Sequence, residues 1–130
     1  MIAIFGFSFE AAHYLPSVGV RDPSYMMHGH TYRVRLEVEG PVEPLTGWIV
    51  IPEDVDKAVD LLRLELDHRC LNDIEDLPIP TLEHVARWIF RRLREPIPSL
   101  VRVTVQATEH RGAICDAAAA DAEIVPPEYG

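Results

Sequence analysis

The stretch His-Gly-His-Thr-Tyr-Arg-Val-Arg-Leu-Glu-Val-Glu-Gly, residues 28–40, decides the fold, because its side chains alternate along its length. One face carries His28, His30, Tyr32, Val34, Leu36 and Val38, and the other carries charged residues and Thr31. A period of two residues is typical of a β-strand with one buried face. The sequence therefore predicts a strand here, with two histidines on its apolar side.

Similar alternation occurs on both sides of this stretch. Residues 1–13 alternate and end on His13, residues 14–27 have no sustained period and are expected to form a loop, and residues 101–109 alternate and end on Glu109. These patterns predict two further strands. A weaker signal predicts a fourth short strand within residues 113–125.

Two helices are expected between the second and third strands. Pro52 opens a series of apolar residues at helical spacing that runs to Leu66, and Thr81 is an N-cap candidate for a second series that ends at Leu93. Strands grouped before and after a helix pair predict an α+β domain, with an antiparallel sheet and two helices on one face. We expect one domain over residues 1–125 and a frayed tail over residues 126–130.

The composition excludes several classes of partner. The chain has 130 residues and a formal net charge of -9, which opposes binding to nucleic acid or to an anionic membrane. The basic run at residues 87–94 has the pattern of a solvated helix face. The sequence shows neither a secretory signal nor an apolar run long enough to span a membrane, so we expect a cytoplasmic protein without membrane or nucleic-acid partners.

Each of three predicted strands has a polar group at one end of its apolar face, namely His13, the pair His28 and His30, and Glu109. Two histidines separated by one residue project the same way, roughly 7 Å apart, and a third imidazole would complete a catalytic zinc site. The alternatives are strand histidines without a metal, and a carboxylate at Glu109 that emerges into water.

A second candidate group follows the first helix at Asp67 and His68. A carboxylate beside an imidazole suits proton transfer near neutral pH. Because adjacent residues need not touch, a capping aspartate and a surface histidine remain the alternative.

Six short motifs, in this order and spacing, resemble the 6-pyruvoyltetrahydropterin and 6-carboxytetrahydropterin synthases. The motifs are Phe-Glu-Ala-Ala-His-Tyr-Leu (9–15), His-Gly-His-Thr-Tyr (28–32), Gly-Trp (47–48), Leu-Asp-His-Arg-Cys-Leu-Asn (66–72), Pro-Thr-Leu-Glu (80–83) and Thr-Glu (108–109). The resemblance covers residues 4–117. It implies a T-fold subunit, trimers that close a β-barrel, and a homohexamer of two trimers with active sites between subunits. It also implies a lyase that acts on a dihydropterin, chiefly 7,8-dihydroneopterin triphosphate.

The resemblance also assigns roles to residues of this sequence. The implied zinc ligands are His13, His28 and His30; the implied proton-transfer pair is Asp67 and His68; the implied pterin-binding residues are Glu109, Thr81 and Glu83. In such a site zinc binds the side-chain hydroxyls of the pterin and lowers their pKa. Triphosphate elimination or carbon-carbon cleavage then gives the product.

This sequence departs from the family pattern at the expected base. Ser24 stands where the family places a cysteine, and an alcohol ionises much less readily than a thiol. Asp22 and Cys70 are the other candidates for this role. Two further departures are Ile51, or Pro52 if the register shifts by one, where the family commonly has an aspartate, and His84, where it has an asparagine. The alternative to an active lyase is therefore a zinc-containing pterin- or purine-binding homologue with little turnover.

Overall fold

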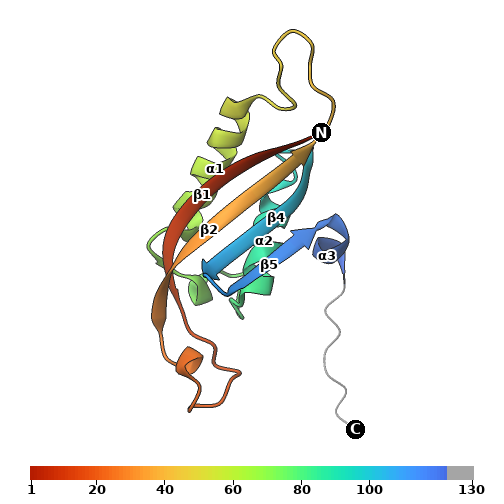
Figure 1. Ribbon diagram of the computed structural model, residues 1–130. Coiled ribbons are helices and arrows are strands. Elements are labelled where there is room, and N and C mark those ends of the chain that lie inside the picture. Colours follow the sequence, from red (N-terminus) through yellow and green to blue (C-terminus); the bar gives the residue numbers. More distant parts are fainter. Residues whose placement is uncertain (123–130) are drawn as a thin grey trace.

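A computed structural model describes residues 1–122, in which helices cover one face of a five-stranded sheet (Figure 1). The elements are β1 (Ile2–His13), η1 (Pro23–Tyr25), β2 (His28–Glu39), α1 (Pro52–Leu66), β3 (Arg69–Cys70), η2 (Leu71–Asp73), α2 (Leu82–Leu93), β4 (Leu100–Thr108), β5 (Arg111–Asp116) and α3 (Ala117–Asp121). The predicted tail and the last residues of the predicted domain lie outside the described part of the chain.

The strands lie in the order β3-β1-β2-β4-β5. The four longer strands pair antiparallel, as predicted, and β5 is the fourth strand that the sequence signalled weakly. The two-residue β3 pairs parallel with β1, so the sheet is mixed rather than purely antiparallel. Two residues are too short to show a period, which is why β3 was not predicted. The sheet is open, with β3 and β5 at its edges.

Two of the helices match the prediction closely. Both α1 and α2 lie behind the sheet in Figure 1, and the Thr81 side chain caps α2 by accepting the backbone N–H of His84 at 3.3 Å. A third, short helix, α3, was not predicted. Asp116 caps it by accepting the N–H of Ala119 at 2.8 Å. A five-residue helix with four consecutive alanines has no apolar period, so only its position after β5 reveals this helix.

The core lies between the helices and the inner face of the sheet. Alternate residues of β1, β2 and β4 are buried there, and α2 contributes six buried side chains. The rings of Phe9 and Tyr32 stack with their centroids 4.8 Å apart, and both side chains are fully enclosed. His13 continues the same buried face at the end of β1, so the core leads directly to the first candidate ligand.

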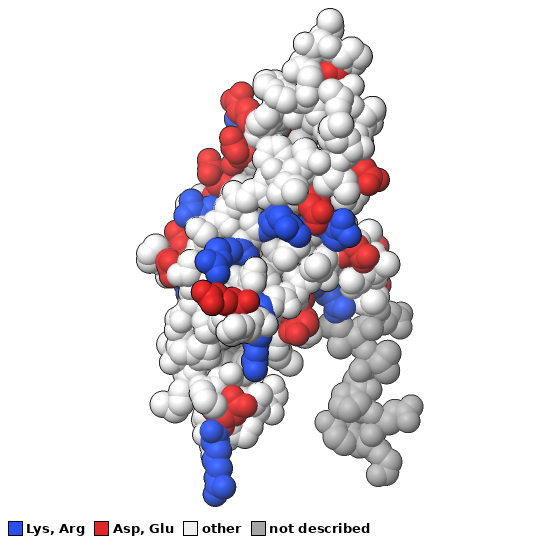
Figure 2. Space-filling view, in the orientation of Figure 1, with Lys and Arg blue, Asp and Glu red and all other residues white. Residues whose placement is uncertain are grey.

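Positive and negative side chains intermix across the middle of the outer face of the sheet (Figure 2), where Ile4 and Ile114 are also exposed. Glu37 on β2 accepts two hydrogen bonds from Arg102 on β4, at 3.0 and 3.1 Å. At the end of α2, Arg92 pairs with Glu65 at 3.4 Å, and the C-cap residue Arg94 pairs with Asp121 at 2.8 Å, so carboxylates neutralise part of the predicted basic face. Within residues 1–122, no helix combines the length and apolar character needed to cross a membrane.

Candidate active site

Three histidines converge at the end of the β1-β2 pair. The strand register sets His13 opposite His28 and Ala11 opposite His30, so all three imidazoles share the inner face. The candidate ligand atoms lie within 4.8 Å of one another, and the Nε2 atoms of His13 and His28 are 3.0 Å apart. The structure thus brings together the three residues that the sequence proposed as metal ligands.

Backbone carbonyls orient two of these rings. The Nδ1 atom of His13 lies 2.8 Å from the carbonyl of Pro80, and that of His28 lies 2.8 Å from the carbonyl of Met26. In the tautomer that these contacts favour, Nδ1–H donates to the carbonyl and Nε2 keeps a free lone pair. The Tyr32 hydroxyl lies 3.2 Å from Nδ1 of His13 and adds a second contact to that ring. A cluster of neutral imidazoles with free Nε2 atoms fits a divalent transition metal.

The local electrostatics favour the neutral form of two of the ligands. Burial, with the adjacent imidazoles as a further cause, lowers the pKa of His13 and of His30 below its usual value, and only the Pro80 carbonyl opposes this for His13. Burial also raises the pKa of Tyr32, so its hydroxyl stays protonated. Neutral histidines can bind a metal ion, whereas protonated ones cannot.

The histidines open into a cavity of about 710 Å³, a size within the ~300–1,000 Å³ typical of small-molecule sites. Its wall includes Ser24, Thr81, Glu83, His110 and Arg111. Of the predicted site residues outside the histidine cluster, three therefore line this cavity. The first turn of α2 supplies two of them, beside the Pro80 carbonyl that orients His13.

The segment expected to be an irregular loop holds Ser24 in a defined position. Residues 23–25 form the 3-10 helix η1, which Asp22 caps by accepting the N–H of Ser24 at 2.9 Å. The N–H of Leu15 donates to the Ser24 carbonyl at 2.8 Å and ties the segment to the end of β1. Ser24 is half-buried on the cavity wall, whereas Asp22 is exposed and its carboxylate serves the cap.

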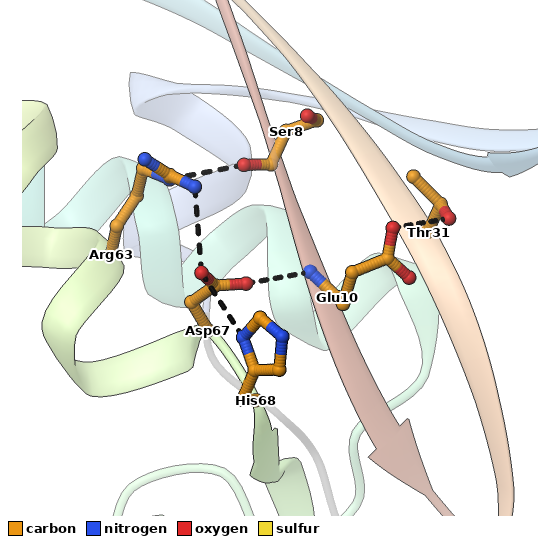
Figure 3. Close-up of polar contacts among 6 residues, drawn as sticks. All are labelled: Ser8, Glu10, Thr31, Arg63, Asp67 and His68. Atoms are coloured by element: carbon orange, nitrogen blue, oxygen red, sulfur yellow. Dashed lines mark hydrogen bonds and ion pairs between the residues drawn. The ribbon is translucent and has the colours of Figure 1, made fainter.

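Asp67 and His68 form a hydrogen-bonded pair beside β1 (Figure 3). Oδ1 of Asp67 accepts the N–H of Glu10 at 2.9 Å, and Oδ2 lies 3.2 Å from His68 Nδ1 and 3.4 Å from Arg63 Nη2. Arg63 is fixed in turn by donating to the Ser8 carbonyl at 3.1 Å. The N–H of Glu10, and after it the nearby His68 and Arg63, hold the pKa of Asp67 below its usual value. The carboxylate is therefore ionised and faces an imidazole.

The backbone of His68 adopts a left-handed conformation, with φ of 59°. This region is unfavourable for a residue with a Cβ atom, and it is held here by a 2.6 Å hydrogen bond from the His68 N–H to the Glu10 carbonyl. Residues held in such conformations are frequent at functional sites. The His68 side chain itself is 79% exposed.

Within one chain, the Asp67-His68 pair does not face the histidine cavity. His68 lines a separate hollow with Glu10, Thr31 and Cys70, on the side of the β1-β2 pair opposite the core. The Thr31 hydroxyl donates to Glu10 there at 2.7 Å. Only His30 borders both the cavity and this hollow among the candidate ligands. The proposed metal ligands and the proposed proton-transfer pair are thus separated in the single chain.

Glu109 differs from the expectation that it would end a strand on the inner face. The register between β4 and β5 shifts between Gln106 and Thr108, β4 ends at Thr108, and Glu109 is exposed in the turn. This irregularity breaks the alternation that placed Glu109 in line with Val105 in the sequence. In the single chain Glu109 does not border the histidine cavity.

The sequence reasoning missed two residues that do border the cavity, His110 and Arg111. Both follow the predicted end of the third strand, and the same register shift turns them toward the cavity wall. Their position beside Glu109 was the available signal. The contact between Tyr32 and His13 was also missed, although Tyr32 lies in register with His28 and His30.

Comparison with known proteins gives a consistent result. Residues 3–118 match the family described as 6-pyruvoyl tetrahydropterin synthase. A dihydroneopterin monophosphate aldolase of Pyrococcus furiosus is 37% identical over 100 residues, which cover 77% of this chain and 81% of that protein. A 6-carboxy-5,6,7,8-tetrahydropterin synthase of Synechocystis sp. is 41% identical over 108 residues, which cover 78% and 82%.

A solved structure is similar over almost the whole chain. The 6-pyruvoyl tetrahydropterin synthase of Caenorhabditis elegans superposes with a TM-score of 0.79 at 26% identity, over 90% of this chain and 95% of that one. This similarity confirms the predicted T-fold.

Proposed function

Because the chain belongs to the 6-pyruvoyl tetrahydropterin synthase family, we propose that it is a lyase that processes a dihydropterin side chain at a zinc site. The observation that carries the proposal is the cluster of His13, His28 and His30, which opens into a cavity large enough for a pterin. Two of these rings are oriented through Nδ1 by backbone carbonyls, which supports metal binding through Nε2.

In the proposed site, His13, His28 and His30 hold the ion and leave one position open. When bound, zinc would supply Lewis acidity that lowers the pKa of the substrate hydroxyls. The protein residues would orient the pterin and move the protons. Thr81 and Glu83 lie on the cavity wall at the start of α2, where they can contact the substrate.

The Asp67-His68 pair is proposed to transfer protons. Asp67 is ionised and would hold the His68 ring in one orientation. Because this pair lies on the other side of β1 and β2 from the cavity, we propose that it serves the site of a neighbouring subunit. Glu109, exposed in the β4-β5 turn, is proposed to accept the N–H groups of the pterin ring in such a shared site.

The open sheet supports this assembly. Unpaired strand edges favour association, and closure of three sheets into a barrel would pair β5 of one chain with an edge of the next. The proposed oligomer is a homohexamer made of two such trimers.

Carbon-carbon cleavage is the proposed reaction, since the aldolase and the 6-carboxytetrahydropterin synthase are both more than 35% identical to the chain. In an aldol cleavage, a base removes the proton of the hydroxyl two carbons from the ring. The bond between the two side-chain carbons then breaks, and its electrons enter the C=N bond of the dihydropterin ring. An aldehyde leaves, and an acid returns the proton to the remaining carbon.

Ser24 favours a second candidate function. It borders the cavity at the position where the family pattern has a cysteine, and a serine hydroxyl is a poor base. A pterin-binding homologue with little turnover would keep the metal site and the pocket but lack this base.

The test is to incubate the purified, zinc-loaded protein with 7,8-dihydroneopterin and with its monophosphate and triphosphate, and to identify products by mass. We expect an aldehyde and a shortened pterin, and we expect His68→Ala to abolish their formation. Tight binding of these compounds without any product would favour the binding homologue. Neither binding nor turnover would contradict both functions.

A further inference from the structure

The start of β5 places one arginine, Arg111, on the wall of the histidine cavity. Arg111 is the only lysine or arginine among the described residues that line this cavity, and Glu83 is the only carboxylate. The cavity wall also carries His110, next to Arg111 in the chain. In the proposed function neither residue holds the metal or the pterin ring. A role in binding another part of the substrate is therefore open to both.

The turn before Arg111 is held close to β4. The N–H of His110 donates to Oγ1 of Thr108 at 3.2 Å, and Arg111 pairs with Thr108 across the two strands. A Cβ atom on Gly112 would lie 3.0 Å from the carbonyl of Val105, so a larger residue would push the two strands apart by a few tenths of an ångström. The backbone of Arg111 is therefore fixed beside the cavity rather than carried on a free loop.

The guanidinium of Arg111 is available for a ligand. Among residues 1–122 it forms no ion pair or side-chain hydrogen bond, whereas Arg63, Arg92, Arg94 and Arg102 each pair with a carboxylate. The chain as a whole has a formal charge of -9, which repels anions. Arg111 is exposed, and a single unpaired positive charge at the wall of the cavity would offset that repulsion at one place.

We infer that Arg111, assisted by His110, forms a phosphate subsite that selects dihydropterins with a phosphate ester on the side chain. The planar guanidinium donates two parallel hydrogen bonds to phosphate oxygens, which a neutral hydroxyl cannot match. One guanidinium suits one phosphate group, so the ligand class is a phosphate monoester rather than a chain of three phosphates. The inference rests on the proposed function, because it assumes that the pterin occupies this cavity.

The test measures binding rather than turnover, using the fluorescence of oxidised, unreactive pterins: neopterin, its monophosphate and its triphosphate. The proteins are the full-length wild type, Arg111→Gln, Arg111→Lys, and Lys57→Gln as a control. Lys57 is exposed on α1 and pairs only with Glu53 among the described residues. Its replacement by glutamine changes the net charge by the same amount as Arg111→Gln. Each protein is measured at two salt concentrations.

We expect the wild type to bind the monophosphate about 10- to 100-fold more tightly than neopterin, the range for hydrogen bonds to a charged group. The triphosphate should gain no more than the monophosphate. In Arg111→Gln the preference should disappear while neopterin binds as before, and Arg111→Lys should keep part of it. Lys57→Gln should behave as the wild type.

The results distinguish a failure of the phosphate subsite from a failure of the proposed function. If the wild type binds neopterin and its monophosphate equally, or if the preference survives in Arg111→Gln, the phosphate subsite is wrong and the proposed function stands. If Arg111→Gln weakens both ligands equally, Arg111 supports the cavity and the subsite is again wrong. If no pterin binds the wild type, both the proposed function and the phosphate subsite are wrong.

Discussion

The hydrogen bonds of the histidine rings define the candidate site at the scale of single residues. His13 and His28 each use Nδ1 for a carbonyl, and their Nε2 atoms meet at 3.0 Å. Sequence spacing predicted that the three histidines would converge, because side-chain direction on a strand follows from its period. The carbonyl partner of His13 could not be predicted, since Pro80 is 67 residues away along the chain.

Ser24 is the residue whose replacement is most expected to increase activity. If position 24 presents its side chain to the substrate, Ser24→Cys should raise the rate of a single turnover by at least ~10-fold, since a well-placed base is worth ~10²–10⁴. Ser17→Cys, an exposed position in the same segment, is the matched control. A wild type that is already fast and insensitive to Ser24→Cys would indicate that another residue, Asp22 or Cys70 first, acts as the base.

The lowered pKa values of His13 and His30 predict how the metal-free protein responds to acid. Between the usual histidine pKa of about 6.5 and the lower folded value, the unfolded chain binds more protons than the folded one. The free energy of unfolding should therefore fall as the pH drops below about 6.5. Urea unfolding between neutral pH and about pH 5 measures this.

His30→Gln removes one of these titrating groups and is the matched variant. Its free energy of unfolding should depend less steeply on pH in the same window. If the two proteins show the same dependence, burial of His30 does not shift its protonation.

Among the helices and strands, the long and regular ones were predicted from the sequence and the short ones were not. The strands β1, β2 and β4 and the helices α1 and α2 were predicted because each repeats its pattern over nine or more residues. β3 is two residues long and depends on pairing with the distant strand β1. η1 is three residues long and depends on the cap that Asp22 provides. The register shift between Gln106 and Thr108 is also a tertiary feature, and it moved Glu109 out of the strand and Arg111 to the cavity.

The start of α2 links helix stability to the site, because the Pro80 carbonyl that orients His13 immediately precedes the Thr81 cap. Thr81→Ala should lower the free energy of unfolding by about 1 kcal/mol through loss of the cap. It should also weaken metal binding, since the Pro80 carbonyl would be held less firmly. Urea unfolding and metal titration measure the two effects.

Thr81→Ser is the control for this change, because serine keeps the capping oxygen. It should restore both stability and metal affinity. A Thr81→Ala protein as stable as the wild type would show that the 3.3 Å contact to His84 contributes nothing to α2.

In the whole molecule, the histidine cavity and the Asp67-His68 pair are separated within one chain, so we expect two subunits to complete each active site. If neighbouring subunits complete each site, two inactive variants should complement each other. His28→Ala and His68→Ala, each inactive alone, should together regain roughly a quarter of wild-type activity when unfolded, mixed equally and refolded. Light scattering on a sizing column should give the mass of a hexamer for each.

Two other results would contradict this arrangement. A stable monomer at micromolar concentration would remove the shared site, and a hexamer whose mixture stays inactive would place the complete site within one chain. Wild-type protein that is unfolded and refolded in the same way controls for refolding losses.

The central claim is that His13, His28 and His30 bind zinc. Elemental analysis of the purified protein, with the same analysis of His28→Ala, His30→Ala and the control His84→Ala, tests it most directly. We expect about one zinc per chain in the wild type and in His84→Ala, and none in the other two. Stoichiometric zinc in a protein that lacks both His28 and His30, or a wild type that binds no zinc when it is supplied, would contradict it.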